Sequence, residues 1–286
     1  MLEMLINPKR AEKHPWEMFF IGAFYATLSL ILVRWIFQGD PVLSKYTGLL
    51  VVTFSVMFTI PFIFFALKEE EEKDLEINGF TRLLKSHSKA LLYFLFLFMG
   101  FIIAFSFWYI AFADGNQNFR AQIETFCIIN KPANYDECVS QYGVTHISKT
   151  TSFFTAKEKI VNIFANNIYV LIFTLVFSLI FGAGAIFILV WNASVISAAI
   201  GIFSQSNLLN LPLGLSRYMI HGMLEISSYF AGALAGGIVS VAIINHDIRS
   251  DKFWIILQDS LNLVILSVVL LFLAALVEVF ITPLLF

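Results

Sequence analysis

The sequence predicts an all-α, polytopic membrane protein, a transmembrane helical bundle with about seven hydrophobic segments. Three observations predict this class. Of the 286 residues, 59% are hydrophobic and only 13% are charged, whereas soluble domains carry about 25% charged residues. The mean hydropathy is +0.82. The apolar residues also gather in long runs, several of which exceed the roughly 20 residues that a helix needs to cross a bilayer.

Three hydrophobic segments precede the longest polar stretch, and they are Phe19–Phe37, Tyr46–Leu67 and Ala90–Ala113. The first is too long for the apolar core of a cleaved signal peptide, so we expect it to remain as an anchor. Pro61 in the second removes a backbone donor and predicts a kink. A charged connector, Lys68–Lys89, follows. Apolar residues share one helical face in its second half, which we expect to lie on the membrane surface.

Four segments follow the polar stretch 114–159, and they are about Asn162–Leu189, Trp191–Ser204, Arg217–Asn245 and Phe253–Phe286. Trp191–Ser204 is short, so it is either a thin span or a re-entrant arm. The side of the membrane on which the chain ends depends on that choice. We expect two parts: residues 1–89, with two spans and the connector, and residues 90–286, the main membrane domain.

Basic residues predict the orientation in the cell membrane. The head contains Lys9, Arg10 and Lys13, and the connector is also rich in Lys and Arg, so both belong in the cytoplasm. The 114–159 loop then faces outside, where an external protein partner could dock. The loop holds both cysteines, Cys127 and Cys138. In an oxidising compartment they would pair rather than remain free thiols, and this would stabilise the loop by about 3 kcal/mol.

The stretch Ile220–Ser240 carries two ionisable residues inside an apolar segment. On a helix, His221, Glu225, Gly232 and Gly236 share one face. The two glycines form a GxxxG pair, which allows another helix to approach closely. An ionised carboxylate that faced lipid would cost at least about 3 kcal/mol. We therefore expect this face to meet protein and to anchor a buried polar cluster.

Other spans supply polar groups that could join this cluster. Asn166 and Asn167 begin the fourth segment, and Asn192 begins the short one. Asp259 and Glu278, in the last segment, are accessory ionisable candidates. Helix packing is expected at the small residues of these spans, which are Gly182, Gly184, Gly222, Gly232 and Gly236.

Two runs in the second half of the chain resemble a known family. They are "ANNIYVLIFTLVFSLIFGAGAIFILVWNASVISAAIG", Ala165–Gly201, and "HGMLEISSYFAGALAGG", His221–Gly237. A paired Asn that opens one helix, a Gly-rich exit leading to an Asn, and a later His-Gly-x-x-Glu are similar to the stage II sporulation protein M family. The resemblance covers roughly residues 90–286. It carries over these positions: Asn166, Asn167, Gly182, Gly184, Asn192, His221, Gly222 and Glu225.

The family name implies, in sporulating bacteria, a membrane scaffold that assembles with cell-wall hydrolases during engulfment. The two leading spans and the connector go beyond the family's short pattern. We therefore expect a non-enzymatic, oligomeric scaffold whose partners are the bilayer, further copies of the chain and an external protein. The polar cluster would hold its helices together. We expect no cofactor, and the net charge of −2 argues against nucleic-acid binding.

Two other functions stay open at this point. The first is an ion or proton channel or transporter, because ionisable residues inside spans often mark a pathway. The second, more remote, is a metal-dependent intramembrane enzyme in which His221 and Glu225 are weak ligand candidates. A catalytic zinc needs about three protein ligands, and the other histidines fall in the head, the connector and the loops.

Overall fold

The computed structural model describes residues 14–74, 80–112, 115–130, 134–142, 156–181, 183–204, 207–245 and 250–285. Every regular element in these ranges is a helix, which confirms the all-α class. Seven of the described helices are long and apolar enough to cross a membrane. The number of apolar segments predicted from the sequence is therefore confirmed.

The first two spans are α2, Glu17–Phe37, and α3, Thr47–Asp74, joined by a turn. In that turn Asp40 Oδ1 accepts the backbone N–H groups of Val42 and Leu43, both at 2.8 Å. These two bonds hold the pKa of the Asp40 carboxyl below its ordinary value. The helix α3 continues through Pro61. The turn therefore connects α2 to α3, and α3 is a single helix despite Pro61.

The third span, α4, covers Phe80–Ala111 and packs closely on α2. A Cβ atom added at Gly22 would collide with the carbonyl oxygen of Leu97, and one at Gly100 would collide with that of Phe19. Glycine is therefore required on both helices for this approach.

The charged connector differs from the sequence prediction. Its first residues continue α3 as far as Asp74, and its second half forms the start of α4. The predicted helix exists, but it is not a separate element. The physical reason is that no Pro or Gly interrupts the chain between Phe80 and Met99, so one helix propagates without a break.

Part of the predicted outer loop is folded as three short helices. They are α5, Gly115–Asn118, α6, Arg120–Asn130, and α7, Tyr135–Gln141. Cys127 on α6 and Cys138 on α7 form a disulfide with Cα atoms 5.9 Å apart, as predicted. Phe119 and Ile123 are fully buried in the same core as the spans. This stretch is therefore packed onto the bundle.

The fourth and fifth spans meet earlier in the chain than predicted. The helix α8 covers Ala156–Phe181 and α9 covers Ile186–Phe203, so the predicted break near residue 190 is wrong. A 3₁₀ turn, Ala183–Ala185, separates the two helices within the glycine-containing sequence GAGA. Glycine disfavours a helix by about 1 kcal/mol relative to alanine, which explains the break there. The helix α9 has 18 residues and is itself a candidate span.

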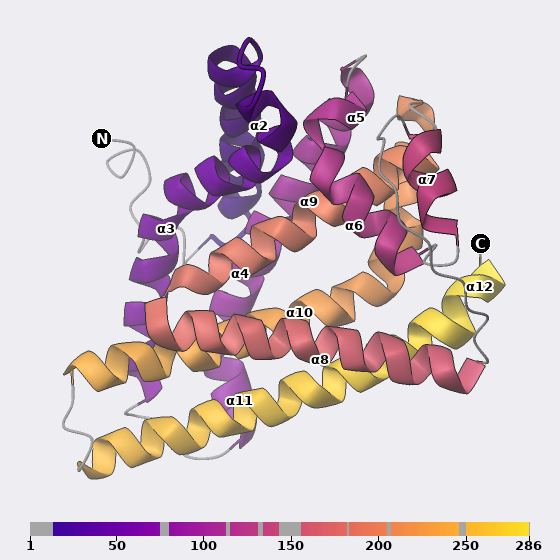
Figure 1. Cartoon of the computed structure of the whole chain (residues 1–286). Coiled ribbons are helices and arrows are strands. Elements are labelled where there is room, and N and C mark those ends of the chain that lie inside the picture. The colour runs from indigo at the N-terminus through magenta and orange to yellow at the C-terminus, as the bar shows by residue number, and fades with distance from the viewer. Residues whose placement is uncertain are drawn as a thin grey trace.

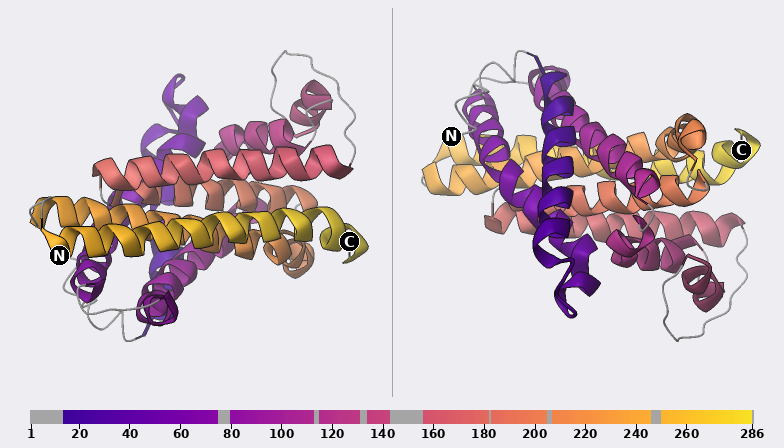
Figure 2. Two further views of the ribbon diagram at one scale, coloured as in Figure 1. Left: turned by 90° about the horizontal axis from the view of Figure 1, so that it is seen from below. Right: turned by 90° about the horizontal axis from the view of Figure 1, so that it is seen from above.

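The last two spans are the longest. The helix α10 covers Leu211–Asn245, and α11 covers Asp251–Leu276 before a π-helical turn, Val277–Ile281, and α12, Thr282–Leu285. Figures 1 and 2 show α8, α10 and α11 running in roughly the same direction, and each of the three contacts the other two. The helices α2, α3 and α4 run across these three helices. Because α10 contacts α3, α4, α8, α9 and α11, it forms the centre of the bundle.

Candidate functional site

Two hydrogen bonds join α8 to α10 at the predicted polar face. The Asn167 side-chain amide donates through Nδ2 to Glu225 Oε1 at 2.7 Å, and the Tyr229 hydroxyl donates to Asn167 Oδ1 at 2.9 Å. Because a carboxylate only accepts, the amide of Asn167 must turn its nitrogen toward Glu225 and its oxygen toward Tyr229. Both ends of this side chain are thereby satisfied.

Burial makes this arrangement important for packing. Asn167 is 7% exposed and Tyr229 2% exposed, and Glu225 is partly buried. The sequence prediction missed Tyr229, although it lies four residues after Glu225 on the same face of α10. That spacing was the available signal, because a buried tyrosine hydroxyl usually finds a partner.

A second contact joins α10 to the end of the chain. His221 Nδ1 lies 3.3 Å from Thr282 Oγ1, and that hydroxyl donates to the backbone carbonyl of Val277 at 3.3 Å. Since threonine has one hydroxyl proton, His221 must donate through Nδ1–H if both bonds are made. The contact thus ties α10 to α12 and to the π-helical turn, which carries Glu278.

The other predicted polar residues lie apart from this group. Asn166 is exposed, and Asn192 donates to the carbonyl of Ile188 in its own helix at 2.7 Å. Asp259 precedes Glu278 by 19 residues, about 28 Å along a helix. Of the three predicted asparagines, the structure therefore brings Asn167 to Glu225 through a direct hydrogen bond.

The glycine pair of α10 lies against α8. A Cβ atom at Gly232 would collide with the side chain of Leu171, and one at Gly236 would lie 2.8 Å from Ser178 Cβ and 3.0 Å from the carbonyl oxygen of Leu175. These glycines therefore allow two helices of the same chain to pack closely.

The other predicted glycines either have room for a side chain or lie near the turn between α8 and α9. A Cβ at Gly222 would meet only the Met219 methyl group at 3.4 Å, an ordinary contact. Gly184 lies in the turn between α8 and α9. Gly182 lies outside the described residues.

Two serines add bonds along α10. Ser178 of α8 donates to the carbonyl of Ala233, and Ser228 donates to the carbonyl of Ser267 in α11 at 2.9 Å. Four side chains of α10 thus bond to other helices, to α8, α11 or α12. They are those of His221, Glu225, Ser228 and Tyr229. Polar residues and glycines on this helix serve contacts within the chain.

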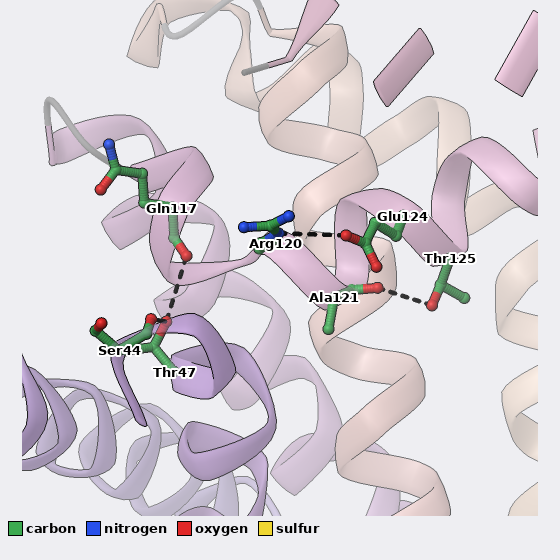
Figure 3. Close-up of polar contacts among 7 residues, drawn as sticks. All are labelled: Ser44, Thr47, Gln117, Arg120, Ala121, Glu124 and Thr125. Atoms are coloured by element: carbon green, nitrogen blue, oxygen red, sulfur yellow. Dashed lines mark hydrogen bonds and ion pairs between the residues drawn. The ribbon is translucent and has the colours of Figure 1, made fainter. Parts of the chain in front are cut away.

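A separate polar contact, unforeseen from the sequence, holds α6 to the bundle. The buried Gln122 amide donates through Nε2 to the carbonyl of Gly48 at 3.0 Å and to Ser194 Oγ at 3.2 Å, so it links α6 to α3 and α9. Nearby, Thr47 Oγ1 donates to the carbonyl of Gln117 at 3.3 Å (Figure 3). Gln122 lies in a polar stretch, where no periodic pattern marks it for burial.

The surface of α6 carries an ion pair between neighbouring turns. Arg120 Nε lies 3.3 Å from Glu124 Oε1, and Figure 3 shows both side chains along the same helix. Pairs of this spacing on a helix contribute about 0.3–0.5 kcal/mol. This pair therefore supports the short helix more than it binds α6 to the bundle.

Two observations on the described residues concern the chemistry of the site. Over the described ranges, no three His, Cys, Asp or Glu side chains gather as they would around a metal ion. Among the cavities between described residues, two of about 10 Å³ each lie beside Phe94 and Ile186, and neither is lined by Glu225 or His221. One water would fill such a volume.

Comparison with known proteins relates the second part of the chain to a family. The model of a family described as "Stage II sporulation protein M" matches residues 90–283. The match includes Asn167, His221, Glu225, Tyr229 and Thr282, and it leaves α2 and α3 outside. No curated protein and no solved structure matches the chain.

Proposed function

Because this chain belongs to the stage II sporulation protein M family, we propose that it is a non-enzymatic, multi-pass membrane scaffold on which other proteins assemble. In this proposal the polar residues of α10 hold the helices in place and take no part in a reaction. The chain works in the cell membrane with its N-terminus in the cytoplasm and α5–α7 outside. It assembles with further copies of itself and with an external protein.

The proposal rests on Glu225 and His221, two polar residues of α10 whose side chains have partners in other helices of the same chain. Glu225 is bonded through Asn167 to α8, and His221 contacts Thr282. Hydrogen bonds between membrane helices contribute about 0.6 kcal/mol on average, but leaving a buried partner unpaired costs about 1–3 kcal/mol. A structural role accounts for these contacts without further chemistry.

The docking surface of the proposed scaffold is the α6–α7 unit. A disulfide holds α7 to α6, and Gln122 anchors α6 between α3 and α9. This gives the unit a fixed position on the bundle. On its outer side Ile128 and Ile129 are more than half exposed, and Glu137 is exposed. A fixed, partly apolar surface suits recognition of another protein.

A channel or transporter is the alternative, favoured by one observation. Glu225 and Glu278 place two carboxyl groups within candidate spans, and such residues often mark an ion or proton path. The metal-dependent enzyme has less support, since the described residues offer no set of three close ligands.

Photo-crosslinking in native membranes tests the scaffold. A photoreactive amino acid at exposed Glu137 is compared with one at buried Val139 on the same helix. The scaffold predicts discrete adducts with another protein from position 137 and none from position 139. Absence of adducts from 137 and also from Ile128, in cells that contain the folded protein, would argue against docking on this unit.

A further inference from the structure

The outer face of α2 is an apolar stripe that ends in a tryptophan at each end. Five side chains on it are between 48% and 82% exposed: Trp16, Phe20, Phe24, Ile31 and Trp35. Their spacings of four, four, seven and four residues place them on one side of the helix. The opposite side, with Met18 and Ile21, is buried. The described bundle therefore leaves this stripe uncovered.

The length of the stripe matches a bilayer. Trp16 and Trp35 are 19 residues apart, which corresponds to about 28 Å along a helix. The hydrocarbon core of a bilayer is about 30 Å thick. No charged residue lies between Glu17 and Arg34, each of which is next to one of the tryptophans. Tryptophan prefers the boundary between hydrocarbon and headgroups, where its ring is buried and its N–H is hydrated.

We infer that the stripe on α2 faces lipid, with Trp16 in one headgroup region and Trp35 in the other, and that α2 stands nearly upright in the bilayer. A span of this length reaches both boundaries only if it is tilted little. The Arg34 guanidinium, whose Cζ lies 4.2 Å from the centre of the Phe112 ring, holds a charge at the same boundary as Trp35.

An upright α2 fixes the direction of the other helices. The helices α8, α10 and α11 run across the direction of α2 in Figures 1 and 2, so an upright α2 leaves these three helices strongly tilted in the membrane. Their lengths agree with this arrangement. The helix α10 has 35 residues, about 52 Å, which exceeds the hydrocarbon thickness and is accommodated by tilting. The orientation holds for a scaffold and for a channel alike.

Depth-dependent fluorescence quenching tests the inference. The chain has five tryptophans. Variants with Trp16 alone, Trp35 alone, or a tryptophan introduced by Phe24→Trp into a background without others are reconstituted in phosphatidylcholine vesicles. The acyl chains carry bromine either near the headgroup or near the chain end. Phe24→Trp serves as the matched control, because position 24 lies on the same stripe between the two ends.

We expect the shallow bromine to quench Trp16 and Trp35 at least twofold more than the deep bromine, and the reverse order at position 24. Equal or deeper quenching of Trp16 or Trp35 would overturn the placement. No quenching at position 24 by either lipid would mean that a second copy of the chain covers the stripe, which also overturns it. If the variants with several tryptophans replaced do not fold, the single substitutions Trp16→Phe and Trp35→Phe are used in their place. Subtracting the quenching of each variant from that of the wild type gives the depth of the tryptophan that was removed.

Discussion

The α2–α4 interface and the α8–α10 interface both depend on glycine, but they treat polar groups differently. Between α2 and α4, Gly22 and Gly100 bring backbone against backbone. Ser29 and Ser106, on these two helices, are buried and have no hydrogen-bond partner among the described residues. Between α8 and α10, the glycines accompany bonded side chains, above all Asn167 with Glu225. One side-chain hydrogen bond also crosses the α2–α4 interface, from Trp108 Nε1–H to Thr27 Oγ1 at 3.0 Å. The difference is that two buried hydroxyls have no described partner there, whereas the buried amide between α8 and α10 is bonded at both ends.

The largest effect is expected at the backbone contact between α2 and α4. Gly100→Ala puts a Cβ atom against the Phe19 carbonyl oxygen, which cannot move without separating the helices. We expect a loss of about 3 kcal/mol, measured as the free energy of unfolding in detergent. Gly39→Ala is the matched control, since nothing lies within 4 Å of a Cβ there. Equal stability of the two variants would refute the contact.

A smaller loss is expected for Gly236→Ala in α10. Its Cβ would lie 2.8 Å from Ser178 Cβ and 3.0 Å from a carbonyl oxygen, both longer than the approach at Gly100, so a smaller separation of the helices relieves the contact. We expect about 1–2 kcal/mol of destabilisation in the same assay. Gly222→Ala, which meets one methyl group at an ordinary distance, should change stability little. If Gly222→Ala proved the more damaging of the two, the role assigned to the glycine pair would be wrong.

The two neighbouring asparagines give the next test. Asn167→Ala removes both bonds and leaves Glu225 and Tyr229 unpaired, so we expect a loss of about 1–3 kcal/mol. Asn166→Ala, on the exposed side of α8, should stay within about 0.5 kcal/mol of wild type. Thermal unfolding in detergent compares them. Similar losses in both variants would show that exposure does not distinguish these positions.

The smallest effects sharpen the contrast between the interfaces. Ser178→Ala removes the donor to the Ala233 carbonyl and should destabilise by about 0.6 kcal/mol. Ser29→Ala removes a buried hydroxyl without a described partner, and it should leave stability unchanged or raise it by up to about 1 kcal/mol. Denaturation of both variants side by side measures the difference. A larger loss for Ser29→Ala would mean that this hydroxyl is bonded.

Periodicity and composition were enough to predict the spans and the disulfide, because long apolar runs and two cysteines close together in one polar stretch are local signals. The division of the chain at residue 89 stays a prediction, although α2 and α3 pack in the same core as the later helices. The break between α8 and α9 was misplaced because the apolar residues continue past Gly182, and hydropathy does not register the low helix propensity of glycine.

The contacts of individual side chains were harder to predict. Asn166 and Asn167 are adjacent and chemically identical, and a rotation of about 100° per residue decides which one meets Glu225. The Gly22–Gly100 approach joins positions far apart in the chain, and only the fold brings them together. Gln122 was missed for the same reason, since its partners lie on α3 and α9.

In the proposed scaffold, Glu225 holds helices together and does not conduct ions. Wild type and Glu225→Gln are reconstituted in liposomes after both are shown to have the same oligomeric size, and proton, monovalent and divalent cation fluxes are compared with those of protein-free liposomes. Glutamine keeps an oxygen that can accept from Asn167, so the fold should persist. We predict no flux above the protein-free level in either. Flux through wild type that falls in Glu225→Gln would contradict the claim and make this group a conduction site.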